Sequence, residues 1–113
     1  AVCIVDDLQN VDVRKIGPLV ENHPIFPNRT NVQFAQIADR HNVKIEIWER
    51  GAGYTLASGS SSCGVAAILH KKGLIENEVN VHMPGGALVV SISEDYALKL
   101  TGPVGRIACG ILL

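Results

Sequence analysis

The residues of this chain that could do chemistry are gathered in the segment 48–64. An alternating run ends there in a glycine loop, and small residues then begin an apolar run of helical length. Gly59, Ser60 and Ser61 would leave backbone N–H groups unpaired in the first turn of that helix, with little side-chain bulk to cover them. Such amides lie at the positive end of the helix dipole, where carboxylates and phosphates bind. The sequence therefore predicts an anion-binding helix tip with Ser58 beside it.

Bulk properties exclude several classes of function. The formal net charge is −1 and Lys and Arg are not clustered, which argues against a nucleic-acid partner. No apolar run approaches the roughly 20 residues that a membrane span needs, and we find no secretion leader. Cys3, Cys63 and Cys109 are too few and too scattered for a disulfide framework or a zinc site. We therefore expect a cytoplasmic protein that binds no metal and no membrane.

The length predicts a single domain, residues 1–113. The chain begins Ala-Val-Cys-Ile-Val, a pattern typical of the inside of a buried strand. Because natural termini seldom begin in buried structure, we expect this domain to be part of a longer polypeptide.

The first third of the chain is expected to hold short elements. Asp12 can cap one helical stretch, and Pro18 fits the first turn of another that ends near Asn22. The hydrophobic pattern predicts strands over residues 1–5, 31–38, 43–50, 79–83, 87–93 and 97–101, with a last strand after Pro103.

The longest helix is predicted over residues 59–72, with Gly73 as its C-terminal cap. Because residues 63–69 include no polar side chain, we expect this helix to be buried on all sides. The fold class is then α+β, with an antiparallel, strand-rich, barrel-like sheet wrapped around one central buried helix.

Several motifs resemble the C-terminal half of diaminopimelate epimerase. They cover nearly the whole chain in the order found in that family: Glu21-Asn22-His23-Pro24, Pro27-Asn28-Arg29-Thr30-Asn31-Val32, Glu49-Arg50-Gly51-Ala52-Gly53, Thr55-Leu56-Ala57, Pro84-Gly85-Gly86 and Thr101-Gly102-Pro103. The resemblance implies a protein of two similar lobes, each a barrel around a central helix, with the substrate held between the helix tips. It implies no pyridoxal phosphate and no metal. The expected partners are a small amino-acid substrate, the N-terminal lobe of the same protein, and a second copy in a homodimer.

The resemblance also assigns roles to residues. Asn31, Glu49 and Arg50 are similar to the residues that hold the distal amino-acid end of diaminopimelate. Gly59 and Ser60 are similar to the helix-tip residues that bind the reacting α-carboxylate. This agrees with the physics, because a positive helix end stabilises the carboxylate most when an α-carbanion forms and its charge spreads onto those oxygens.

Ser58 departs from the family pattern, in which one cysteine from each lobe works at the substrate's α-carbon. A thiol at a helix N-terminus gives a usable thiolate, whereas a serine hydroxyl needs a neighbouring base, and the local sequence offers none. Three explanations fit: an enzyme with one-base chemistry, an epimerase in which Ser58 relays protons, or an engineered Cys-to-Ser change. The serine run 58–62, and Tyr54 where the family usually has Glu, favour natural divergence. We expect Cys63, deeper in the helix, to be a small buried side chain.

Simpler explanations stand beside these assignments. The pair Gly51 and Gly53 lacks the third glycine and the acidic residue of a dinucleotide fingerprint. Glu49 and Arg50 are neighbours on a strand, so regular geometry would point them to opposite faces as a solvated pair. Asn31 alone is typical of a polar strand start. Only the resemblance favours a substrate-binding role for these three residues.

Three functional hypotheses follow. The first is the C-terminal lobe of a cofactor-independent amino-acid epimerase, converting LL- to meso-diaminopimelate in lysine biosynthesis by two-base α-proton transfer, with Ser58 at the second acid/base position. The second is a diverged isomerase or dehydratase that uses one base. The third is a catalytically inactive lobe that binds carboxylates. In each case the isolated lobe is expected to be inactive, because half of the site lies in the other lobe.

Overall fold

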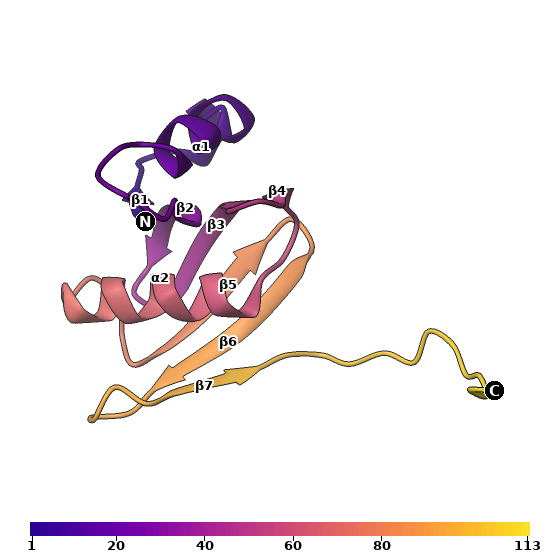
Figure 1. Cartoon of the computed structure of the whole chain (residues 1–113). Helices are drawn as coiled ribbons and strands as arrows, with labels where there is room; N and C mark the ends of the chain where they lie inside the picture. Colours follow the sequence, from indigo (N-terminus) through magenta and orange to yellow (C-terminus); the bar gives the residue numbers. More distant parts are fainter.

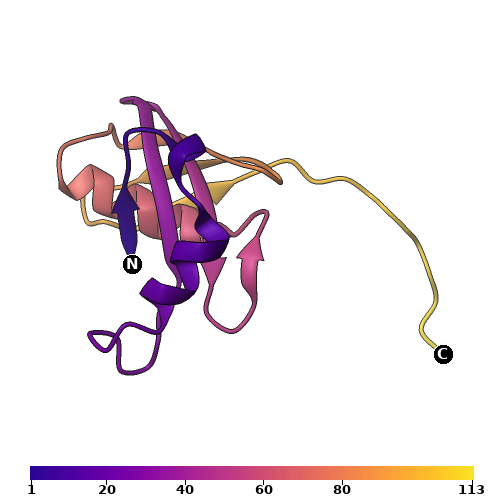
Figure 2. The same cartoon turned by 90° about the horizontal axis from the view of Figure 1, so that it is seen from above.

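The computed structural model describes all 113 residues and contains one seven-stranded sheet with a helix on each face (Figures 1 and 2). In chain order the elements are β1 (Val2–Ile4), the 3-10 helix η1 (Leu8–Asn10), α1 (Val13–Glu21), β2 (Val32–Asp39), β3 (Asn42–Glu49), β4 (Gly53–Thr55), α2 (Gly59–Lys71), β5 (Glu78–Met83), β6 (Gly86–Ile92) and β7 (Leu98–Thr101). The α+β content of the prediction is confirmed.

The sheet is mixed and open. Its order is β1-β2-β3-β5-β6-β7, with β4 paired to β3. The pairs β1–β2 and β3–β5 are parallel, so the prediction of an antiparallel sheet is wrong for them. The β3–β5 pair is parallel because β4 and α2 form the crossover between these strands, as parallel pairing requires. The sheet bends around α2, but its edge strands β1 and β7 do not pair, so no closed barrel forms (Figure 1).

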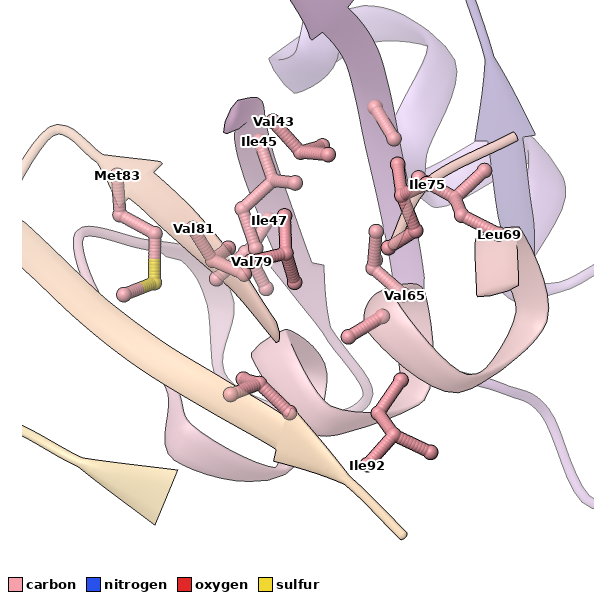
Figure 3. Close-up of a cluster of buried hydrophobic side chains, with 13 residues drawn as sticks. Val43, Ile45, Ile47, Val65, Leu69, Ile75, Val79, Val81, Met83 and Ile92 are labelled. Carbon is pink, nitrogen blue, oxygen red and sulfur yellow. The ribbon is translucent and has the colours of Figure 1, made fainter. Parts of the chain in front are cut away.

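The core lies between α2 and the inner face of the sheet. Alternation along β3 turns Val43, Ile45 and Ile47 toward α2. Figure 3 shows these side chains in one buried cluster with Val65 and Leu69 of the helix. The opposite face of the sheet packs against α1 and η1 in a smaller cluster, whose buried members are Leu8, Val13, Val32 and Phe34.

One stripe of α2 is uncovered, which contradicts the expectation of a helix buried on all sides. Val65, Ala66 and Leu69 are fully buried, but Gly64 is exposed and Ile68 is 42% exposed. The physical reason is the open sheet, which leaves the side of the helix between β1 and β7 without a neighbour. None of the helices has the length and apolar character needed to cross a bilayer.

Two further expectations are wrong. The helical stretches predicted around residues 12–22 form one helix, α1, with Pro18 inside it and Asp12 as its N-cap. Pro18 removes one hydrogen bond to the preceding turn, but Val13, Gly17 and Glu21 hold the helix on the sheet by their buried face. Residues after Pro103 form no strand and run away from the body of the molecule, because no strand lies beside them to pair with (Figures 1 and 2).

Two helical glycines provide a matched test of this packing. A Cβ at Gly17 would lie 2.5 Å from Cγ of Trp48, whereas a Cβ at Gly64 would meet nothing within 4 Å. Gly17→Ala should lower the free energy of unfolding by about 1–2 kcal/mol, since overpacking outweighs the gain in helix propensity. Gly64→Ala should raise it by about 0.5–1 kcal/mol. Urea unfolding of both variants measures the difference, and equal effects would contradict the contact between α1 and Trp48.

Candidate functional site

The helix tip, formed by Ser58, Gly59 and Ser60, begins α2. Ser58 is the N-cap, in extended conformation with φ −153° and ψ 122°. Its Oγ accepts the amide of Ser61 at 3.4 Å and lies 3.3 Å from Oγ of Ser60. The amides of Gly59 and Ser60 donate to no group of the chain. Two unpaired N–H groups therefore lie at the positive end of a 13-residue helix.

Hydrogen bonds from two strands hold this first turn in place. The amide and Oγ of Ser62 donate to the carbonyl of Ser58 at 3.1 and 2.9 Å. Sδ of Met83, in β5, lies 3.4 Å from both the amide of Ser58 and Oγ of Ser62. From β2, Nε2 of Gln33 donates to Oγ of Ser61 at 3.0 Å, in a buried contact. The turn is therefore anchored to the sheet, while its two leading amides are unpaired.

Neighbouring backbone approaches the helix tip closely. The amide of Gly85 donates to the carbonyl of Leu56 at 2.8 Å, and a Cβ at Gly85 would lie 2.9 Å from the same oxygen. A Cβ at Gly59 would lie 2.8 Å from Cδ2 of Leu100 in β7. Glycine is required at residue 85, because backbone is the obstacle there, and a small residue suits residue 59.

Asn31, Glu49 and Arg50, here called the distal group, come together at the end of β3. Oδ1 of Asn31 accepts the amide of Arg50 at 2.8 Å, and Nη1 of Arg50 donates to the carbonyl of Asn28 at 3.0 Å. Glu49 is the last residue of β3 and pairs with Gly53. The structure thus joins Asn31 to the Glu49–Arg50 pair, although these residues are far apart in the sequence.

The distal group and the helix tip are connected through β2. Asn31 directly precedes β2, and Gln33 of that strand binds the first turn of α2. Residues two apart share one side of a strand and are about 7 Å apart, so both groups lie toward the same end of the sheet. No hydrogen bond joins one group directly to the other.

No role was predicted from the sequence for two polar residues that support the site, Gln33 and Glu21. The carboxylate of Glu21 is buried and accepts hydrogen bonds from Nε1 of Trp48 at 2.7 Å and from Gly51 and Arg29 at 3.1 Å. The Trp48 bond first, and then the Gly51 and Arg29 contacts, lower the pKa of Glu21. The sequence held a signal for it, because Glu21 lies on the buried face of α1, four residues after Gly17.

Tyr54 lies away from the helix tip. Its hydroxyl donates to Oε2 of Glu46 at 3.2 Å, and the guanidinium of Arg14 lies 4.2 Å from the centre of its ring. Burial, followed by the charge of Glu46, raises the pKa of Tyr54. Its partners belong to the α1 side of the sheet, so this departure from the family pattern does not touch the N-terminal end of α2.

No side chain near Ser58 can act as its base. Its hydroxyl meets only the Ser60 hydroxyl and the Ser61 amide. Cys63 is half-buried against the core, and this burial raises the pKa of its thiol, as suits a core side chain. No group of three or more His, Cys, Asp or Glu side chains is arranged to hold a metal ion.

One cavity of the molecule lies away from the helix tip. It has a volume of about 590 Å³ and is lined mainly by side chains that point away from α2. Its polar lining consists of Asp7, Gln9, Gln36, Asp39, Asn42, Lys44, Glu46 and His82. This cavity is therefore separate from the helix tip, where Ser60 is exposed.

Comparison with known proteins identifies the family. The family model described as diaminopimelate epimerase matches residues 1–107. The chain is 50% identical over 111 residues to diaminopimelate epimerase 2 of Nostoc sp., covering 98% of this chain and 39% of that protein. It is 42% identical over 114 residues to diaminopimelate epimerase of Desulfitobacterium hafniense, covering 99% of this chain and 40% of that protein. The chain thus spans about two-fifths of the length of these relatives.

Solved structures show the same fold at low identity. A putative phenazine biosynthesis PhzC/PhzF protein from Clostridium difficile matches 82% of this chain and 33% of its own, with a TM-score of 0.62 and 13% identity. A phenazine biosynthesis protein of the PhzF family from Bacillus anthracis matches 88% of this chain over 33% of its own length, with a TM-score of 0.60 and 14% identity. The family model and the sequence identity to the relatives show more than a shared fold: this chain belongs to the diaminopimelate epimerase family.

Proposed function

We propose that this chain is the C-terminal lobe of a cofactor-independent amino-acid epimerase that converts LL- to meso-diaminopimelate. One observation carries the proposal: the unpaired amides of Gly59 and Ser60 at the start of α2, beside the side chain of Ser58. The relatives named diaminopimelate epimerase supply the substrate class.

The helix tip binds the α-carboxylate of the reacting centre. Removal of the α-proton leaves a carbanion whose charge spreads onto the carboxylate oxygens, and the amides of Gly59 and Ser60 stabilise that charge most in the transition state. These donors need no reorganisation, because contacts from Gln33 and Met83 already fix the turn. The distal group binds the other amino-acid end of the substrate.

Ser58 lies at the second acid/base position implied by the family resemblance. In a two-base reaction, a base of the N-terminal lobe removes the proton from one face, and a proton reaches the opposite face from the Ser58 side. The hydroxyl is too weak an acid to form an anion unaided, so Ser58 acts as a relay between water or a group of the other lobe and the α-carbon.

One observation favours a second candidate, a one-base isomerase or dehydratase. The hydroxyl of Ser58 is engaged in capping α2 and has no imidazole or carboxylate beside it. An enzyme that removes a proton from a single face of the α-carbon requires residue 58 only as this helix cap. The helix tip still holds the carboxylate.

The rest of the protein completes the site and covers α2. The stripe of α2 that includes Gly64 and Ile68 is open, and the sheet edges β1 and β7 are unpaired. We propose that an N-terminal lobe faces the helix tip and that the barrel closes in the whole protein, which forms a homodimer. Three free cysteines suit a reducing, cytoplasmic location.

Exchange of the α-proton in D₂O separates the candidate functions. The full-length protein incubated with LL-diaminopimelate should introduce deuterium at the α-carbon of both stereoisomers, because two bases act on opposite faces. Mass spectrometry after chiral separation measures this. Cys63→Ala serves as the control and should leave exchange within about 3-fold of the wild type, since burial removes its thiol from chemistry.

The other possible results of the exchange experiment support the other candidate functions. Deuterium retained in one stereoisomer alone, or elimination from another substrate, supports the one-base enzyme. A folded protein that exchanges no α-proton refutes the epimerase proposal and leaves a carboxylate-binding lobe.

Ser58→Cys tests the electrostatics of the helix tip directly. The positive helix end should lower the pKa of the introduced thiol, whereas burial raises the pKa of Cys63. At pH 7 iodoacetamide should therefore modify the introduced thiol at least about 10-fold faster than Cys63, by peptide mass mapping. Exposed Cys109 provides the reference rate. Equal modification of the two helix positions would show that the tip carries no useful positive potential.

A further inference from the structure

Glu21 is the only charged side chain buried in the chain, with 5% of its surface exposed. A buried carboxylate is costly unless hydrogen bonds and an opposite charge satisfy its oxygens. Here the contacts come from two segments, one with Arg29 and the other with Trp48 and Gly51. Oε2 accepts the indole N–H of Trp48 at 2.7 Å, and Oε1 accepts Nη1 of Arg29 and the amide of Gly51 at 3.1 Å each.

These three donors flank the distal group. Gly51 directly follows Arg50, and Arg29 lies two residues before Asn31. The Asn31 side chain in turn accepts the amide of Arg50 at 2.8 Å. The segment with Arg29 and Asn31 and the segment with Trp48, Arg50 and Gly51 are therefore linked twice. The carboxylate of Glu21 links them from α1, and the side-chain amide of Asn31 links them within the distal group.

Two of the donors, Arg29 and Gly51, have a left-handed backbone conformation. Arg29 has φ 59° and Gly51 has φ 77°, in the left-handed region. A non-glycine residue persists there only when its surroundings hold it, and such residues gather at ligand-binding sites. Arg29 is held by the ion pair with Glu21 and by the hydrogen bond that its backbone amide donates to the carbonyl of Phe26 at 2.9 Å.

The third donor is equally constrained. The ring of Trp48 packs on Gly17 so closely that a Cβ there would lie 2.5 Å from its Cγ. Trp48 therefore packs closely on α1, with its N–H directed at Glu21. The carboxylate, the ring and the helix lie together at the end of β3.

We propose that Glu21 is a positioning residue for substrate recognition, which fixes Asn31, Glu49 and Arg50 in the geometry that binds the distal end of the substrate. This rests on the proposed function. Glu21 does not touch the substrate, and the helix tip has its own anchors in Gln33 and Met83. Loss of the carboxylate should therefore weaken substrate binding more than it slows the chemical step.

Steady-state kinetics of the full-length enzyme with LL-diaminopimelate tests this role. Glu21→Gln keeps the size of the side chain but removes its charge and replaces one acceptor by a donor. We expect KM to rise roughly 10-fold or more with kcat within about 3-fold, since a misplacement of binding groups by about 1 Å can cost about 100-fold. The matched control is Glu76→Gln, which removes the chain's other ion pair, with exposed Arg40, and should change neither constant more than about 2-fold.

A folded Glu21→Gln enzyme with unchanged KM overturns the proposal and leaves Glu21 a purely structural residue. If that variant does not fold, Arg29→Ala replaces it, because the Arg29 side chain is 53% exposed and its loss removes one donor only. A KM increase of at least about 3-fold then supports the proposal, and an unchanged KM opposes it.

A second measurement does not depend on activity, so it separates failure of this proposal from failure of the proposed function. In ¹H–¹⁵N spectra, Glu21→Gln should move the indole signal of Trp48, the only tryptophan of this chain, and the amide signals of Arg50 and Gly51. The amide of Ser60 should stay in place. Unmoved signals of Arg50 and Gly51 would refute the positioning role even in an enzyme with another substrate.

Discussion

The packing of α2 against the concave face of the sheet is the contact on which the rest of the structure depends. Val65 and Leu69 belong to the same buried cluster as Ile45 and Val81, in a core where each buried aliphatic side chain is worth about 1.5–3 kcal/mol. This apolar contact fixes the axis of the helix, and therefore the direction of its first amides. The unpaired amides lie at a partly exposed helix end, where water satisfies them until a ligand binds.

Rigid elements carry both halves of the candidate site. The helix tip is anchored by side chains of β2 and β5, and the distal group is held where β3 ends, above the buried carboxylate of Glu21. Both depend on the register of β2 against β3, in which Val32 lies opposite Trp48. A shift of one residue would turn Gln33 away from the helix and separate Asn31 from Arg50.

Sequence patterns predicted those elements whose residues carry a local signal. The alternation of Val43, Ile45 and Ile47 gave β3 correctly, and the apolar run after Ser58 gave α2. The parallel pairs, the helix through Pro18 and the open stripe at Ile68 were not predicted. Each of these is decided by neighbours distant in sequence: a crossover, a buried helix face, and the edges of an unclosed sheet.

By itself, the sequence determined that small residues begin a helix beside Ser58 and that the chain carries the motifs of its family, because backbone chemistry and motif order are local properties. Only the tertiary structure decided which polar groups meet: Glu21 with Trp48, and Gln33 with the first turn of α2. Hydrogen bonds between distant residues follow from strand register and helix placement, and no spacing along the chain encodes them. The same physics explains why Glu21, whose role the sequence did not predict, lies at the centre of the site's support.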